Sequence, residues 1–193
     1  MQYTIVKDDV IIIVDVQKDF CPGGALPVPR GDKIIPILNQ YIELFERYGA
    51  KIYATRDWHP PNHVSFISQG GKWPPHCVRG TRGAEFHPDL SLPEKTKIIS
   101  KAIHPKKEAY SGFDGTILSE ELEKNESQRV FVGGLATDYC VKNTVLDSLT
   151  LAYETHLLVD ATLGINLEAY DTQRAIEEMV KKGAKKSKLT NFL

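Results

Sequence analysis

Short runs of β-branched and aliphatic residues alternate along this sequence with segments whose apolar residues recur at helical spacing. The runs predict strands at residues 10–16, 51–55, 97–101, 129–133, 155–160 and 186–191. The helical patterns lie at residues 34–48, 138–151 and 169–182. Repeated strand–helix units predict an α/β fold, a three-layer αβα sandwich with a mostly parallel sheet of about six strands.

The length and composition fit one domain spanning residues 1–193. Such a chain, with 41% hydrophobic residues, can build one sizeable core. A formal net charge of −1 leaves no basic stripe, which argues against nucleic-acid and membrane-surface partners. The first apolar run is too short for a signal-peptide core or a membrane span, so we expect a cytoplasmic protein.

The three cysteines are Cys21, Cys77 and Cys140, an odd number without a Cys-x-x-Cys pair, which argues for reduced thiols. Cys140 should lie in the first turn of a helix that follows the fourth strand and its Gly-Gly turn. A helix N-terminus and a nearby cation lower the pKa of a thiol, and the backbone N–H groups of such a turn can form an oxyanion hole. The alternative is a small buried cysteine without chemical function.

Two charged residues are expected at the same sheet edge as Cys140, because ligands of open parallel sheets bind outside the carboxyl ends of the strands. Asp15 follows the first strand, where partial burial would raise the pKa of its carboxyl group toward that of a useful base. Lys101 ends the third strand, and its ammonium could pair with Asp15 and favour the thiolate. A turn-capping aspartate and an exposed edge lysine are the alternatives.

Asp57, His59 and His76 form a candidate metal site. One carboxylate and two imidazoles suit a divalent transition metal with open positions for water or ligand, and zinc, iron and manganese are all compatible. Unliganded loop histidines are the alternative. His63 fits a hydrogen-bonding role beside the site better, and its ligation stays open. The segment 58–92 is rich in Pro, Gly and His, and we interpret it as a wall of the active site.

Phe20 and Trp73 are candidate aromatic contacts for a flat ring, although either residue is more often simply part of the packing. Neither a GxGxxG fingerprint nor a GxxxxGKS/T loop occurs in the sequence. Dinucleotide and nucleoside-triphosphate sites therefore lack their motifs.

Four segments resemble motifs of the isochorismatase-like cysteine hydrolases, and within them of the nicotinamidases. They are the segments DVQKDF at 15–20, TRDWHP at 55–60, WPPHC at 73–77 and GLATDYCV at 134–141. The resemblance covers residues 10–160 in the order and spacing of the family. It implies an isochorismatase-like fold and an amidase that hydrolyses nicotinamide to nicotinic acid and ammonia through a Cys thioester, in NAD salvage, with pyrazinamide as a further substrate.

The resemblance also implies roles for single residues. A Cys, an Asp and a Lys form the catalytic triad of the family, which corresponds to Cys140, Asp15 and Lys101. A cis peptide is implied before Ala136, with the backbone N–H groups of Ala136 and Cys140 as the oxyanion hole.

Nicotinamidases carry a metal beside the triad, which implies one divalent ion per chain, zinc in the first place, on Asp57, His59 and His76. The pyridine nitrogen of the substrate would face this metal. Phe20 and Trp73 would hold the ring between them.

Two alternatives stay open at this point. One is a metal-free amidase or isochorismatase-type hydrolase, and the other is a non-catalytic protein that binds a metal or a small ligand. The expected partner is a small-molecule substrate, and the sequence leaves open whether the chain forms a homo-oligomer.

Overall fold

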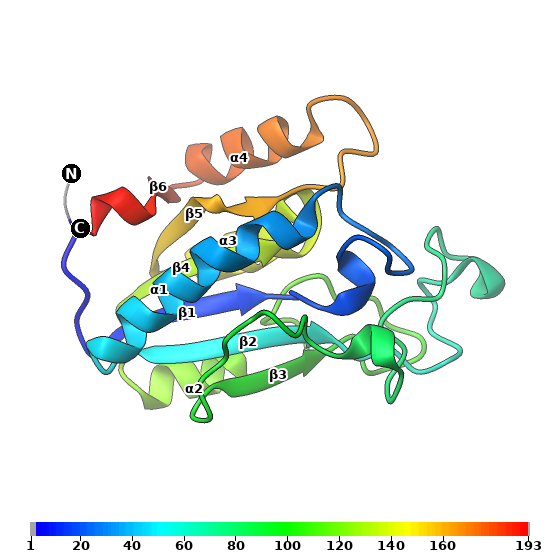
Figure 1. Cartoon of the computed structure of the whole chain (residues 1–193), viewed down its shortest axis with the longest axis horizontal. Helices are drawn as coiled ribbons and strands as arrows, with labels where there is room; N and C mark the ends of the chain where they lie inside the picture. The colour runs from blue at the N-terminus through cyan, green and yellow to red at the C-terminus, as the bar shows by residue number, and fades with distance from the viewer. Residues whose placement is uncertain (1–2, 193) are drawn as a thin grey trace.

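Six strands form one sheet in the order β3-β2-β1-β4-β5-β6, and every pair of neighbours is parallel (Figure 1). The structure is a computed structural model that describes residues 3–192. The strands are β1 (Asp9–Val14), β2 (Lys51–Asp57), β3 (Lys97–Lys101), β4 (Arg129–Leu135), β5 (Glu154–Leu163) and β6 (Lys185–Ser187). The predicted α/β fold with about six strands is thus confirmed, and the sheet is entirely parallel.

Helices cover both faces of the sheet. They are α1 (Ile35–Arg47), α2 (Leu118–Lys124), α3 (Lys142–Thr150) and α4 (Asp171–Lys181). Figure 1 shows α1 crossing one face, where its apolar side chains pack with Ile11 and Ile13 of β1. The neighbouring Val10, Ile12 and Val14 point to the other face, into a core shared with α2, α3 and α4. All six residues of β1 are buried, which explains the continuous apolar run at residues 10–14. Among the described helices, none is long and apolar enough to cross a bilayer.

Several elements differ from the sequence-based expectation. Three strands, β2, β4 and β5, end two or three residues later than expected, at Asp57, Leu135 and Leu163. β1 ends at Val14, two residues early, because Asp15 adopts a left-handed φ of 50°. The short helix α2, between β3 and β4, was not predicted from the sequence. The expected strand at 186–191 is only partly correct: β6 ends at Ser187, and the N–H of Lys188 then donates to the Asn191 side chain, closing a 3-10 turn at Leu189–Asn191.

The segment 58–92 contains no strand and only two short 3-10 turns, at Ile67–Gln69 and Arg82–Ala84. Isolated backbone bridges connect parts of this segment to each other and to the chain after β1. His59 exchanges hydrogen bonds with residues 77 and 79, while residues 16 and 18 pair with residues 85 and 87. The predicted irregular wall is therefore an ordered structure, held at the carboxyl ends of β1 and β2.

Candidate active site

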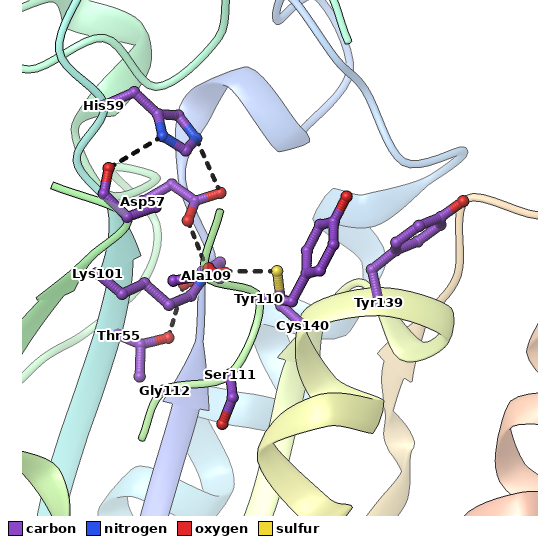
Figure 2. A network of polar contacts seen from close by, with 12 residues as sticks. Thr55, Asp57, His59, Lys101, Ala109, Tyr110, Ser111, Gly112, Tyr139 and Cys140 are labelled. Carbon is purple, nitrogen blue, oxygen red and sulfur yellow. Dashed lines mark hydrogen bonds and ion pairs between the residues drawn. The ribbon is translucent and has the colours of Figure 1, made fainter. Parts of the chain in front are cut away.

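Lys101 lies at the centre of a buried polar cluster at the carboxyl edge of the sheet. Its Nζ is 2.9 Å from Asp15 Oδ2, 2.6 Å from Asp57 Oδ1 and 3.4 Å from Cys140 Sγ. A further hydrogen bond of 3.2 Å goes to the carbonyl of Ala109. Figure 2 shows the ammonium between Asp57 and Cys140, with His59 on the far side of Asp57. Each of the four strands β1 to β4 thus supplies one group, from its own end or from the turn that follows it.

The sheet register explains why the charged groups meet. Asp57 and Lys101 are direct partners across the β2–β3 ladder. Asp15 leaves the ladder just after its N–H has donated to the carbonyl of Thr55, and its Oδ1 accepts a 2.6 Å hydrogen bond from Thr55 Oγ1. The second oxygen, Asp15 Oδ2, is buried and receives no directed hydrogen bond from the described residues, although the Lys101 ammonium is near. Asp15 Oδ2 can therefore accept a proton without losing a directed hydrogen bond, although it is ion-paired with Lys101.

The pKa values of the two carboxyl groups in the cluster are shifted in opposite directions. Burial raises the pKa of Asp15 above its ordinary value, although Lys101 acts against this shift. Burial would also raise the pKa of Asp57, but Lys101 and His59 outweigh it and lower that pKa. Two acids whose pKa values are pushed apart are typical of a proton-transfer group beside a permanently charged one. Asp15 fits the first role and Asp57 the second.

The surroundings of Cys140 favour its thiol form over the thiolate. Burial raises its pKa well above the ordinary value, and Lys101 opposes the shift without cancelling it, since Asp15 and Asp57 add to the effect of burial. The expectation that a helix start and a nearby cation would lower this pKa is therefore wrong. The thiol needs a base to become a nucleophile.

The turn that carries Cys140 differs from an ordinary helix start. Thr137–Val141 is a π-helical turn, in which the N–H of Val141 bonds to the carbonyl of Ala136. The peptide between Leu135 and Ala136 is cis, as the family resemblance predicted. Cys140 lies within this turn, between Tyr139 and Val141, whose N–H groups both donate to the Ala136 carbonyl.

Asp57, His59 and His76 lie together as the sequence predicted. Asp57 Oδ2 is 3.4 Å from His59 Nε2 and 4.0 Å from His76 Nε2. The Nδ1 atoms of the two rings contact backbone carbonyls, at 3.3 Å for His59 and 2.8 Å for His76. Such contacts fix the tautomer that leaves Nε2 free as a metal ligand. His59 Nε2 is buried without a hydrogen-bond partner among the described residues, so the donor set fits a divalent metal.

His63 lies beside this group but does not offer it a free nitrogen. Its Nδ1 is 2.7 Å from Ser65 Oγ, and its Nε2 is 3.0 Å from the carbonyl of Lys107. The ring packs on His59 with a centroid separation of 4.2 Å. Both nitrogens already have protein partners, which indicates a supporting role for His63.

A cavity with largely aromatic walls opens in front of these groups. It is lined by Phe20, Leu26, Asp57, His59, Trp73, His76, Glu108, Tyr110, Ala136, Tyr139, Cys140 and Ile165. Phe20 and Trp73, the two predicted aromatic contacts, both belong to it. Tyr110 and Tyr139 were not predicted: Trp73 Nε1 donates to Tyr110 Oη at 3.0 Å, and the Trp73 and Tyr139 rings meet edge-on. Tyr139 could have been suspected because it precedes Cys140, whereas Tyr110 has no such sequence signal.

Comparisons with known proteins agree with this geometry. A family model described as an isochorismatase domain matches residues 9–189. The chain is 38% identical to the nicotinamidase of Escherichia coli, over 90% of this chain and 92% of that protein. It is also 38% identical to the nicotinamidase/pyrazinamidase of Mycobacterium tuberculosis, over 88% and 92%.

Two solved structures share the fold. The pyrazinamidase of Pyrococcus horikoshii, in complex with zinc, is 54% identical with a TM-score of 0.91, covering 94% of this chain and 99% of that chain. The protein PnC1 from L. infantum, in complex with nicotinate, is 32% identical with a TM-score of 0.93, covering 100% and 99%.

Proposed function

The chain belongs to the isochorismatase family, and we propose that it is an amidase that hydrolyses nicotinamide to nicotinic acid and ammonia. The relatives from E. coli and M. tuberculosis carry this activity in their names, and nicotinate is the product of the proposed reaction. Pyrazinamide, with a similar ring and the same amide, is a second proposed substrate. We place the reaction in NAD salvage in the cytoplasm, where the three free thiols would stay reduced.

One observation supports the proposed chemistry above all others: the buried carboxylate of Asp15, whose Oδ2 receives no directed hydrogen bond from the described residues, lies near the thiol of Cys140. A carboxylate oxygen of Asp15 and Cys140 Sγ lie within 4.8 Å of each other. Asp15 is thus placed to accept the thiol proton, and its raised pKa suits a group that must later return a proton.

The reaction has two halves. In the first, Cys140 Sγ bonds to the amide carbon while Asp15 takes the thiol proton; the C–N bond then breaks, and the nitrogen leaves as ammonia with that proton. In the second, water adds to the thioester carbon as Asp15 takes a water proton. The C–S bond breaks, and the proton returns from Asp15 to the Cys140 sulfur, releasing nicotinic acid.

Lys101 and the turn before α3 would stabilise charge during both halves. The ammonium of Lys101 touches Asp15, Asp57 and Cys140, so it balances two carboxylates and holds the sulfur near its base. We assign the backbone N–H groups of Ala136 and Cys140 to the oxyanion hole, where donors act on charge that develops in the transition state.

We assign Asp57, His59 and His76 as the ligands of one divalent metal, with zinc as the first choice and iron or manganese as alternatives. The zinc complex of the Pyrococcus neighbour supports this choice. When bound, the ion would supply a Lewis-acid position for the pyridine nitrogen. Phe20 and Trp73 would hold the ring between them and so fix the amide over Cys140.

The activity is tested by incubating the purified protein with nicotinamide and measuring ammonia and nicotinic acid. We expect equal amounts of both products from the wild type and none from Cys140→Ala. Cys21→Ala is the matched control, since Cys21 is also a buried free thiol but does not line this cavity, and it should keep most of the activity. Absence of ammonia release by the wild type would refute the proposal.

The metal is tested separately. The purified protein should contain about one divalent ion per chain, and His76→Ala should lose it while His87→Ala, outside the ligand set, should keep it. Benzamide, which lacks the ring nitrogen, should be a poor substrate. If metal-stripped protein hydrolyses nicotinamide as fast as the metal-loaded form, the metal-free amidase is the correct alternative.

A further inference from the structure

The side-chain amide of Gln17 forms two hydrogen bonds with the backbone of Asp57, one as donor and one as acceptor. Gln17 Nε2 donates to the Asp57 carbonyl at 2.8 Å, and Gln17 Oε1 accepts the Asp57 N–H at 2.8 Å. Nε2 also donates to the carbonyl of Ala84 at 2.9 Å. Gln17 is fully buried, so no water competes for these bonds.

The Gln17 amide takes the place that further residues of β1 would occupy beside the end of β2. β1 pairs with β2 only as far as Val14, because Asp15 turns away with its left-handed φ, yet β2 continues to Asp57. Thr55 already points its carbonyl at β1, and alternate residues of a parallel strand present their backbone groups to the same neighbour. The N–H and C=O of Asp57 therefore face a side of β2 that β1 has left. Gln17 supplies the donor and acceptor that the next residues of β1 would have offered.

Asp57 needs this support because both of its carboxylate oxygens are in use. Oδ1 contacts Lys101, and Oδ2 faces the Nε2 atoms of His59 and His76 (Figure 2 shows Asp57 between Lys101 and His59). A small shift of the Asp57 backbone would misplace both contacts together. The third bond of Gln17, to Ala84, anchors the same amide to the segment 58–92, which also contains His76.

We infer that Gln17 is a positioning residue for the metal site: it holds Asp57 in place as a ligand without touching metal or substrate. This inference rests on the proposed function for the existence of that metal. Loss of a partner that orients a metal ligand weakens metal binding by about 10–100-fold. We expect the same range when Gln17 loses its hydrogen bonds.

The test compares Zn²⁺ affinity, by chelator competition, in the wild type, Gln17→Met and Asn39→Leu. Methionine keeps the length of glutamine but can neither donate nor accept these bonds. Asn39 is the matched control. Its side-chain amide also binds backbone groups, donating to the Asp89 carbonyl and accepting the Ser91 N–H, but Asn39 lies outside the cavity. Both variants should lower Tm, whereas only Gln17→Met should weaken Zn²⁺ binding 10–100-fold. Nicotinamide hydrolysis by Gln17→Met should recover as Zn²⁺ is raised above its new Kd.

Equal Zn²⁺ affinity of the wild type and Gln17→Met would overturn this inference and leave the proposed function intact. Failure of the wild type to bind Zn²⁺ would overturn the metal assignment, and the inference with it. If Gln17→Met does not fold, Gln17→Glu takes its place, because it keeps one acceptor for Asp57 but loses both donors. The same loss of Zn²⁺ affinity is then expected, and wild-type affinity would again decide against a positioning role.

Discussion

Replacing Lys101 by methionine tests whether the buried ammonium is the charge that holds this site together. The Lys101 side chain is fully buried and lies within 3 Å of two carboxylates, at 2.9 Å from Asp15 and 2.6 Å from Asp57. Methionine is of similar length and apolar, so Lys101→Met removes the charge with little change in packing. Removal of one partner from a buried ion pair costs about 3–5 kcal/mol, because the other partner stays buried without compensation. For a chain of this size, that loss corresponds to a Tm lower by about 6–20 °C.

The cost should depend on pH, and its sign follows from Asp15. Burial already raises the pKa of Asp15, and Lys101 is the main opposing influence, so the pKa should rise further in the variant. An acid whose pKa is higher in the folded than in the unfolded state stabilises the fold at low pH and loses that contribution as pH rises through the folded pKa. The deficit of Lys101→Met relative to the wild type should thus be largest near pH 8 and shrink on acidification. Protonation of Asp15 alone can reduce this deficit in the free energy of unfolding by up to about 2.7 kcal/mol between pH 8 and pH 6.

Urea unfolding at pH 8 and pH 6 measures both quantities, with a chelator present so that metal release does not contribute. Lys97→Met is the matched control, since Lys97 begins the same strand and pairs with Glu121 at the surface. It should unfold like the wild type at both pH values, because exposed ion pairs contribute little. A destabilisation by Lys101→Met that is small, or that does not shrink at pH 6, would refute the reasoning.

Three further predictions concern the same chain. Asp15→Asn and Lys101→Ala should each lower kcat about 1000-fold or more, and the double variant should be little worse than the worse single one, because the groups act as a unit; losses that multiply would show independent action. Thr55→Val removes the 2.6 Å hydrogen bond to Asp15 and should lower kcat about tenfold with KM little changed; an unchanged kcat would show that this bond does not orient the base. Burial lowers the pKa of His156, so the unfolded state binds more protons and stability should fall between pH 7 and pH 5. The dependence of the free energy of unfolding on pH, measured by urea unfolding, should be weaker in His156→Phe but not in His104→Phe, an exposed control. Equal pH dependence in the two variants would contradict the role given to His156.

The charged centre of the site was predictable because one rule of parallel sheets places it. Residues at the carboxyl ends of parallel strands meet at one edge of the sheet, and Asp15, Asp57 and Lys101 all follow or end such strands. Cys140 was found from its position after the fourth strand. Apolar runs and spacing therefore contain enough information to bring these four side chains together.

Other features could not be predicted, each for a physical reason. The raised pKa of Cys140 comes from its burial near two carboxylates, which no local sequence pattern reveals. The function inferred for Gln17 arises only because Asp15 leaves the ladder before β2 ends, and backbone φ values are not encoded in apolar spacing. Tyr110 lies in the irregular chain after β3, where no periodic sequence pattern could indicate that it lines the cavity.

The order of the site residues along the chain also determines when, during synthesis, the site can be completed. β4 pairs with β1 rather than with β3, and Cys140 follows Lys101 by 39 residues. A ribosome therefore delivers both acids and the amine before it delivers the sulfur. A nascent chain that has made only β1 to β3 leaves one edge of β1 open, and it does not yet contain the thiol of Cys140. During synthesis, amidase activity can therefore appear only after β4 and the turn that carries Cys140 have left the ribosome and β4 has paired with β1.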